Sequence, residues 1–213
     1  MDWVAWHADY DSDTPLRRRL EVVQRRTREF LEEWPGSPVR VISMCAGEAR
    51  DLLGALDSME RRDVTGRLVE LDPTLAARAQ EHATRLGLAE LEVVAGDAGQ
   101  SAAYEGVAPA DLLLACGVFG NISDADIERT VRAFPELVRK GGSVIWTRGR
   151  AIADVTPLIR GWLKEIGFEE LAFDLVPDAP GTVGVARNAT DSHPLVDQQL
   201  FTFTRTDSGR DGR

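Results

Sequence analysis

Short apolar runs alternate with amphipathic segments along most of the chain. The apolar runs predict five buried strands, at residues 39–44, 66–71, 91–95, 111–116 and 143–147. The amphipathic segments have helical spacing and predict helices at about 49–59, 73–86, 124–138 and 156–166. The third of these helices is expected to be interrupted at Pro135 and closed by residues 139–142. Strands that alternate with helices are typical of an α/β domain with a mostly parallel sheet.

The two ends of the chain depart from this alternation. Within residues 1–37, apolar positions with helical spacing begin after Thr14. They predict an N-terminal helical cap segment. After the last helix, two final strands are expected from three segments whose pairing stays open, 168–175, 182–187 and 199–204. We therefore predict one domain over residues 38–205, followed by a polar, Gly-rich tail at 206–213 that is expected to be disordered.

Composition narrows the class of protein. The 213 residues carry a net charge of −10 and have a pI near 4.8, which disfavours nucleic acid and anionic membrane surfaces as partners. No apolar run approaches the roughly 20 residues of a membrane helix, and no signal-peptide core is evident near the start. Cys45 and Cys116 have no metal-type spacing, so no metal is expected. A cytoplasmic protein with reduced thiols is the expectation.

The ends of the first two strands carry candidate chemistry. A turn of small residues, Cys45-Ala46-Gly47, follows the first strand and leads into a helix. The second strand carries Glu70 near its end, about twenty residues further on. In nucleoside-binding α/β folds such a turn lets the ligand approach the backbone, and such an acid accepts hydrogen bonds from ribose hydroxyls. This pairing predicts a site for an adenosine-like group.

The order of elements and four motifs resemble the class I S-adenosylmethionine-dependent methyltransferases. The family's acid-x-Gly-x-Gly-x-Gly motif falls on residues 43–49, where only Gly47 is retained and Ser43 replaces the acid. The family's next two acids fall on Glu70 and Asp97, and its fourth motif falls on residues 114–121. A Leu-x-x-Gly-Gly passage at 137–142 also matches. Residues 117–121 together with 146–148 are similar to an actinobacterial small-molecule subgroup.

This resemblance implies a fold, a cofactor and a set of site residues. The fold is a doubly wound, Rossmann-like, seven-stranded, mostly parallel sheet with an antiparallel last strand. The cofactor is S-adenosyl-L-methionine, and its product is S-adenosyl-L-homocysteine. Glu70 would accept both ribose hydroxyls, and Asp97 would accept the adenine amino group. The implied cofactor-binding residues are Cys45, Ala46, Gly47, Glu48, Arg50, Asp51, Glu70, Leu71, Asp97, Ala98, Cys116, Gly117, Val118 and Asn121. Caps and surface pairs explain Glu48, Arg50 and Asp51 equally well.

The resemblance further implies methyl transfer to a small-molecule acceptor by direct displacement, mainly through proximity and alignment. His7 and Tyr10 are candidate bases, because N-terminal segments in this fold often close over the cofactor. Trp6, Arg148 and Arg150 are candidate acceptor-binding residues, and the two arginines suit an acidic acceptor. Packing of the N-terminal aromatic residues and ordinary surface positions for the arginines remain alternatives. Both a monomer and a homodimer stay open.

Two other classes of function compete with this interpretation. An NAD-dependent oxidoreductase would carry Gly-x-Gly-x-x-Gly after the first strand, and residues 45–50 do not supply it. A non-catalytic binding protein with the methyltransferase fold is the other alternative, since residues 43–49 depart from the family motif. Retention of both Glu70 and Asp97 favours the enzyme.

Overall fold

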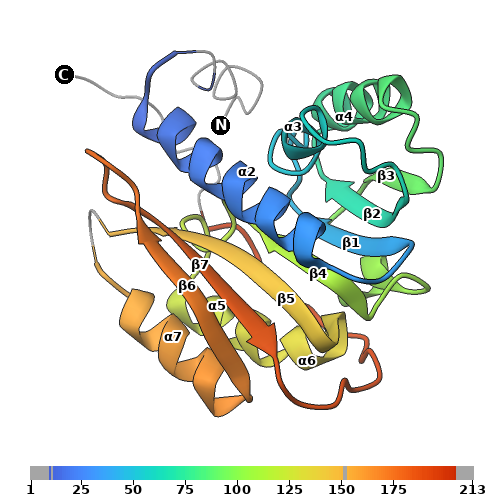
Figure 1. The fold of residues 1–213 in the computed structure, drawn as a ribbon. Coiled ribbons are helices and arrows are strands. Elements are labelled where there is room, and N and C mark those ends of the chain that lie inside the picture. Colours follow the sequence, from blue (N-terminus) through green and yellow to red (C-terminus); the bar gives the residue numbers. More distant parts are fainter. Residues whose placement is uncertain (1–9, 11, 151–152, 205–213) are drawn as a thin grey trace.

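The computed structural model describes residues 10, 12–150 and 153–204, which form a single seven-stranded sheet (Figure 1). The strands lie in the order β3-β2-β1-β4-β5-β7-β6. Their bounds are Val39–Met44 for β1, Val64–Glu70 for β2, Leu91–Ala95 for β3, Ala110–Ala115 for β4, Val138–Gly149 for β5, Phe168–Leu175 for β6 and Gly181–Asn188 for β7. Strands β1 to β5 pair in parallel, and β7 pairs antiparallel with both β5 and β6. The predicted fold class is therefore confirmed.

Helices cover both faces of the sheet (Figure 1). Their bounds are Pro15–Glu33 for α2, Leu53–Leu56 for α3, Pro73–Arg85 for α4, Asp124–Arg132 for α5, Phe134–Leu137 for α6 and Thr156–Glu165 for α7, with a 3₁₀ turn at Ser101–Tyr104. Helices α2, α3 and α4 share one apolar core with the sheet, and α5, α6 and α7 share the other. Successive strand residues such as Val41 and Ile42 point into opposite cores, as the pleat of a strand requires.

Helix α2 is fixed across the sheet by polar contacts at both ends. The Thr14 side chain caps its start by accepting from the backbone N–H of Arg17. Arg26 donates to both carboxylate oxygens of Asp174 on β6, at 2.7 and 2.9 Å. Arg61 holds the other end by donating to the carbonyl of Leu31. Consequently the first turns of α2 lie at the edge of the sheet where the parallel strands end (Figure 1).

Two of the predicted helices differ clearly from the structure. Residues 139–142 do not close a helix, because α5 ends at Arg132, α6 holds Pro135 in its first turn, and β5 already begins at Val138. The helix predicted at 49–59 is reduced to Leu53–Leu56. The tail predicted at 206–213 lies outside the described residues.

Of the three segments considered for the final strands, the one at 199–204 does not form a strand. It makes only an isolated bridge from Gln199 to Gln100. It runs instead along the edge where the parallel strands end. Leu200 donates its backbone N–H to Gly99 O at 2.7 Å, and Thr204 donates to Asn121 O at 2.9 Å. Both final strands come from the two earlier segments, because β7 fills the place between β5 and β6.

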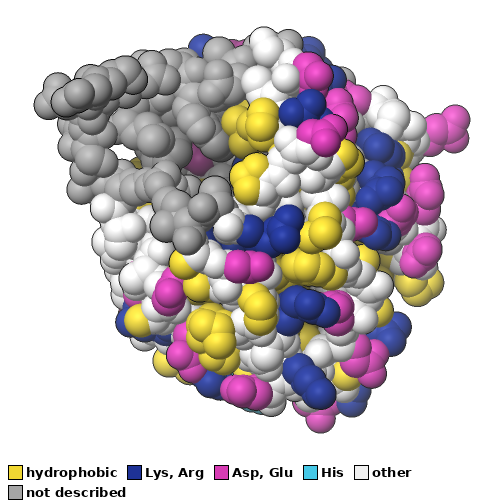
Figure 2. All heavy atoms as spheres, turned by 90° about the vertical axis from the view of Figure 1, so that its left-hand side faces the viewer, with side chains coloured by type: hydrophobic (Ala, Val, Ile, Leu, Met, Phe, Trp, Pro, Cys, Tyr) yellow, Lys and Arg dark blue, Asp and Glu magenta, His cyan; other side chains and the backbone are white. Residues whose placement is uncertain are grey.

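The described residues contain no candidate membrane-spanning helix and no candidate metal-binding cluster. None of the helices among the described residues is long and apolar enough to cross a bilayer. Within the same residues, no group of three His, Cys, Asp or Glu side chains could hold a metal ion. On the face shown in Figure 2, acidic and basic side chains of the described residues are interspersed.

Gly184 provides a test of the packing between β5 and β7. It pairs with Trp146 across the two strands, and a Cβ at position 184 would lie 2.2 Å from Trp146 Cε2. Trp146 is only 1% exposed and packs against Phe119 and Phe173, so the ring has little room to move. We expect Gly184→Ala to lower the free energy of unfolding by about 1–3 kcal/mol in denaturant titrations.

Gly149→Ala is the matched control for this prediction, because no described residue beyond its two chain neighbours lies within 4 Å of a Cβ added there. Equal unfolding free energies for the two variants would contradict the packing described here.

Candidate functional site

The turn after β1 has an unusual backbone. Cys45, Gly47 and Ala49 all adopt left-handed conformations, with φ of 52°, 58° and 54°. These are the three positions at which the family motif has glycine. A left-handed conformation costs a residue with a side chain roughly 1–2 kcal/mol. The chain therefore keeps the backbone path of a glycine-rich turn although two of the three glycines are replaced.

Glu70 ties this turn to the end of β2. Its Oε2 accepts from the backbone N–H of Gly47 at 2.8 Å, and its Oε1 accepts from the N–H of Asp72 at 2.9 Å. The residue is only 8% exposed. Each carboxylate oxygen has a second lone-pair direction, so Glu70 can accept further hydrogen bonds from a ligand.

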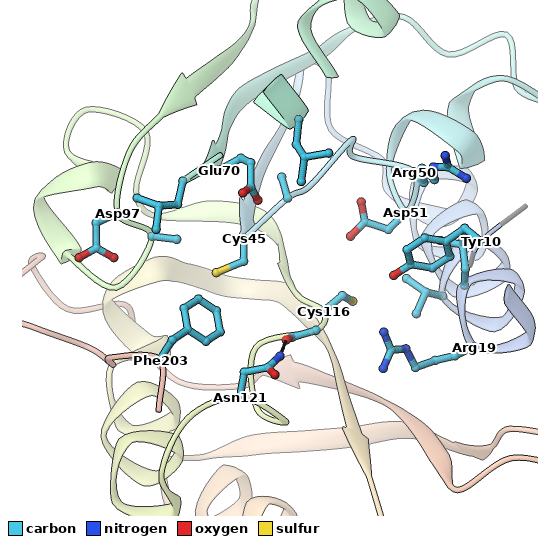
Figure 3. A pocket seen from close by; sticks show the side chains of 17 residues that line it. Tyr10, Arg19, Cys45, Arg50, Asp51, Glu70, Asp97, Cys116, Asn121 and Phe203 are labelled. Carbon is cyan, nitrogen blue, oxygen red and sulfur yellow. Dashed lines mark hydrogen bonds between the residues drawn. The ribbon is translucent and has the colours of Figure 1, made fainter. Parts of the chain in front are cut away.

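A cavity of about 1000 Å³, counted with its open mouth, lies beside this turn (Figure 3). The ends of β1, β2 and β4, the loop after β3 and the first turns of α2 form its walls. Glu70 and Asp97 lie toward one end of it, and Asp51, Tyr10 and Arg19 lie toward the other. The lining residues are Tyr10, Arg19, Leu20, Val23, Cys45, Ala46, Arg50, Asp51, Glu70, Leu71, Leu75, Asp97, Ala98, Cys116, Gly117, Asn121 and Phe203.

Most of the predicted cofactor residues line this cavity, and so does Tyr10. Gly47, Glu48 and Val118 do not. The Gly47 N–H is bound to Glu70, and Val118 is fully buried in the core. The Glu48 carboxylate binds the guanidinium groups of Arg50 and Arg78, each at 2.7 Å, so it is engaged in ion pairs.

The predicted acceptor-binding residues either do not line the cavity or lie outside the described residues. Arg148 and Arg150 lie at and just beyond the end of β5, and neither belongs to the cavity lining. Arg148 is near the loop after β4, since its Nη1 would lie 3.8 Å from a Cβ at Gly120. Trp6 and His7 lie outside the described residues.

Sequence reasoning missed two kinds of lining residue. No residue of α2 was among the predicted site residues, whereas Arg19 lines the cavity with Leu20 and Val23. Phe203 comes from the segment that was predicted as a strand, and Leu75 comes from the apolar stripe of α4. The apolar neighbours of Arg19 in the sequence were the available signal, because a residue beside buried positions on a helix can also face inward.

Burial changes the charge states in the cavity. It raises the pKa of Asp51 to about 6, although the backbone N–H of Leu52 donates to its Oδ1 at 2.8 Å and acts in the opposite direction. Burial also raises the pKa of Tyr10, and Arg19 partly opposes this rise. The pKa values of the Cys45 and Cys116 thiols lie well above their usual range, again because of burial. Both thiols and the phenol are therefore neutral at neutral pH.

The raised pKa of Asp51 predicts a pH-dependent penalty on stability. A pKa of about 6 in the folded protein against the usual 3.8 corresponds to about 3 kcal/mol above pH 6, lost progressively as the pH falls toward 4. Asp51→Asn removes the charge and keeps an oxygen for the Leu52 N–H. We expect this variant to unfold at higher denaturant concentration than the wild type at pH 7.5, and at a similar concentration near pH 4.

Asp57→Asn is the control, because Asp57 is exposed and pairs only with His82 among the described residues. A gain for Asp51→Asn that does not change with pH would contradict the assignment of the penalty to the buried charge.

Solved methyltransferase structures are similar to the chain at low sequence identity. The magnesium protoporphyrin IX methyltransferase of Synechocystis PCC 6803 with bound S-adenosylmethionine has a TM-score of 0.64 and 12% identity, over 88% of this chain and 98% of that one. A TehB-like S-adenosylmethionine-dependent methyltransferase from Corynebacterium glutamicum has a TM-score of 0.57 and 16% identity, over 76% of this chain and 86% of that one.

An O-methyltransferase family protein from Burkholderia thailandensis has a TM-score of 0.61 and 16% identity over 80% of this chain, which spans about half of that protein, 55% of its length. No protein-family model and no curated protein sequence matches the chain. The chain thus has the Rossmann-like fold of the class I S-adenosylmethionine-dependent methyltransferases.

Proposed function

We propose that this protein is an S-adenosylmethionine-dependent methyltransferase that acts on a small molecule. The observation that carries the proposal is the placement of Glu70 and Asp97 on the wall of one cavity, beside a turn with the backbone of a glycine-rich motif. The fold is consistent with this assignment, and the structural neighbours that bind S-adenosylmethionine or its product support it.

The residues of the cavity fit the groups of this cofactor. Glu70 has lone pairs left for the two ribose hydroxyls after its bonds to the backbone. Asp97 is exposed and binds the Gly99 N–H through Oδ1, which leaves Oδ2 for an adenine amino group. Leu71 is 64% exposed at the cavity wall, an apolar surface that a base would cover. The cofactor supplies a methyl group on a sulfonium, which is already activated for displacement.

The chain itself contributes binding, alignment and the exclusion of water. Cys45 and Cys116 line the same cavity, and a thiolate there would compete with the acceptor for an electrophilic methyl group. Their raised pKa values keep both thiols protonated at neutral pH. Burial thus disfavours the thiolate form that an electrophilic methyl group would alkylate.

The acid–base roles follow from the charge states. Because Tyr10 stays neutral, we assign it a positioning role as a hydrogen-bonding wall of the cavity. His7 is the candidate base and Trp6 a candidate wall of the acceptor site. An alignment mechanism does not require a base when the acceptor is already anionic.

Glu70→Ala tests the cofactor assignment by calorimetry with S-adenosylhomocysteine. We expect the variant to bind about 1–3 kcal/mol more weakly, because charge-assisted hydrogen bonds to the ribose are lost. Asp97→Ala should weaken binding in the same direction. Glu92→Ala is the matched control, since Glu92 forms a surface pair with Arg67 on the neighbouring strand.

The fold of each variant is checked by circular dichroism, because Glu70 also holds the turn. Binding of NAD but not of S-adenosylhomocysteine by the wild type would favour an oxidoreductase instead. Binding of neither would favour a non-catalytic protein.

The proposed acceptor is a small anion, such as a carboxylic acid. The Nε atoms of Arg148 and Arg150 are buried and have no hydrogen-bond partner among the described residues. Arg148 also lies near the loop after β4, which carries the cavity residues Gly117 and Asn121. A guanidinium whose Nε has no partner among the described residues is suited to a carboxylate, which it can bind with two parallel hydrogen bonds.

This assignment predicts a charge preference among acceptors. In a panel of acids and their neutral amides, we expect production of S-adenosylhomocysteine with the acids alone. Arg148→Gln and Arg150→Gln should raise KM for an accepted acid roughly tenfold or more, as one charge-assisted hydrogen bond predicts. Arg187→Gln, which breaks a surface pair with Glu169, is the control. Equal turnover of acids and amides would contradict an anionic acceptor.

Further properties of the proposed enzyme are its location and assembly. We propose a cytoplasmic protein, because Cys45 and Cys116 are free thiols. One similar structure, however, is described as a possible exported protein from Bordetella parapertussis. Both a monomer and a homodimer fit the proposal.

A further inference from the structure

The Asn121 side chain lines the cavity from the loop after β4 (Figure 3). Its Nδ2 donates to the carbonyl of Gly117 at 2.7 Å. A carbonyl oxygen only accepts hydrogen bonds, so this contact fixes which end of the amide is the NH₂ group. The other end, Oδ1, has no hydrogen-bond partner among the described residues. The cavity wall thus offers a ligand one oriented acceptor atom.

The backbone on both sides holds Asn121 in place. Its N–H donates to the carbonyl of Val118 at 2.9 Å. Its carbonyl accepts from the N–H of Thr204 at 2.9 Å and from the Thr204 hydroxyl at 3.2 Å. Strand β1 lies between β2 and β4, so this loop and Glu70 lie on opposite sides of β1. Ligands of open α/β sheets bind at such a place, where the strand order reverses.

Arg148 lies beside the same loop but outside the cavity lining. It comes two residues after Trp146 on β5 and therefore lies on the same face of the strand, the face that packs with α5 to α7. Its Nη1 would lie 3.8 Å from a Cβ at Gly120, the residue before Asn121. The guanidinium and the amide therefore belong to one loop region, the amide on the cavity wall and the guanidinium beyond it.

The charges around Arg148 leave one positive charge unmatched among the described residues. Hydrogen bonds from Thr156 lower the pKa of Asp154, and the charges of Arg150 and Arg148 lower it further, so both guanidinium groups lie near this carboxylate. The Nε atoms of both arginines are nevertheless buried without a hydrogen-bond partner in the described part of the chain. Two guanidinium groups and one carboxylate are balanced by one anionic group of a ligand.

A carboxylate held by these arginines is a poor choice as the methylated group. Its oxygens would share their lone pairs with guanidinium N–H groups, which makes them less reactive toward an electrophile. The arginines also do not line the cavity that holds Glu70 and Asp97. The anionic group and the methylated atom are therefore different parts of the acceptor.

We propose that the acceptor is bifunctional, with an anionic group bound by Arg148 and Arg150 and a hydroxyl or amino group that donates to Asn121 Oδ1 inside the cavity. The inference rests on the proposed function. The lone pair of that oxygen or nitrogen forms the bond to the methyl carbon, and the carbon–sulfur bond breaks with its electrons kept by sulfur. The proton of the methylated atom passes to water. Asn121 directs the lone pair, and the product is an ether or an amine that keeps its negative charge.

Three matched sets of small molecules test this substrate class by production of S-adenosylhomocysteine. The first set contains hydroxybenzoates, aminobenzoates and short aliphatic hydroxy acids. The second lacks the hydroxyl or amino group, and the third has an amide in place of the acid. We expect turnover in the first set alone, because only these molecules carry both groups. The product should resist alkaline hydrolysis, which cleaves a methyl ester.

Variants separate the two contacts. We expect Asn121→Ala to lower kcat for an accepted acid about tenfold or more, because the nucleophile loses its orientation. Calorimetry with the same acid should show an affinity within about threefold of the wild type, since a neutral hydrogen bond contributes little net binding. Arg148→Gln should weaken binding of the acid about tenfold. Neither change should alter binding of S-adenosylhomocysteine by more than about twofold.

Gln80→Ala is the matched control, because Gln80 is an exposed amide on α4 that contacts only Thr84 among the described residues. Its kcat and its affinity for the acid should equal those of the wild type. Circular dichroism checks that each variant is folded.

The outcomes separate the inference from the function on which it rests. Turnover of an acid without a hydroxyl or amino group, to an alkali-labile ester, overturns the inference and leaves the methyltransferase proposal standing. An unchanged kcat in Asn121→Ala also overturns it, and so does the absence of turnover in all three sets by a protein that binds S-adenosylhomocysteine. Failure of the wild type to bind S-adenosylhomocysteine overturns the proposed function, and the inference with it.

Discussion

The site depends on one carboxylate that accepts two backbone hydrogen bonds. Glu70 joins the N–H of Gly47, in the turn after β1, to the N–H of Asp72, at the exit from β2. The turn contains two residues with side chains in the left-handed region, a conformation that is unfavourable by itself. Hydrogen bonds to a charged, nearly buried acceptor offset that cost. The side chain that would bind a ribose therefore also shapes the turn that would lie beside it.

Charge in the cavity is arranged for a ligand with distinct ends. Toward the nucleoside end lie acids that have no ion-pair partner among the described residues, and an acid and a guanidinium lie toward the other end. Between them lie Cys45 and Cys116, which burial keeps protonated. A site that handles an electrophilic methyl group benefits from neutral thiols, because only the thiolate is a strong nucleophile. The same burial that raises the thiol pKa values makes Asp51 sensitive to pH near 6.

The cavity is completed by segments distant in sequence from the motifs. Helix α2 brings Arg19 to one side, and the segment after β7 brings Phe203 to another. Leu200 and Phe201 anchor this last segment, since both are almost fully buried in the core shared with α5. Backbone bonds to Gly99 and Asn121 attach it to the loops after β3 and β4. These contacts hold the segment that carries Phe203 against the edge of the sheet.

The sequence by itself determined the parts of the protein that follow from local rules. β1 and β3 lie within the predicted bounds because short aliphatic runs specify buried strands. Glu70 and Asp97 could be brought together from sequence alone, because parallel neighbouring strands end at the same edge. The cap at Thr14 and the turn at residues 45–49 were likewise readable from neighbouring residues.

Only the tertiary structure decided which other residues reach the cavity. Arg19 lies among several arginines on one helix, and its apolar neighbours alone do not decide which of these arginines lines the cavity. Its direction depends on how α2 packs across β7, a contact between segments more than 140 residues apart, as in the Arg26–Asp174 pair. Phe203 lines the cavity because β7 lies between β5 and β6, so the last segment is not a strand of the sheet. That segment instead crosses the edge at which the parallel strands end. Such placements result from packing between whole elements, and hydrophobic periodicity within each element does not encode them.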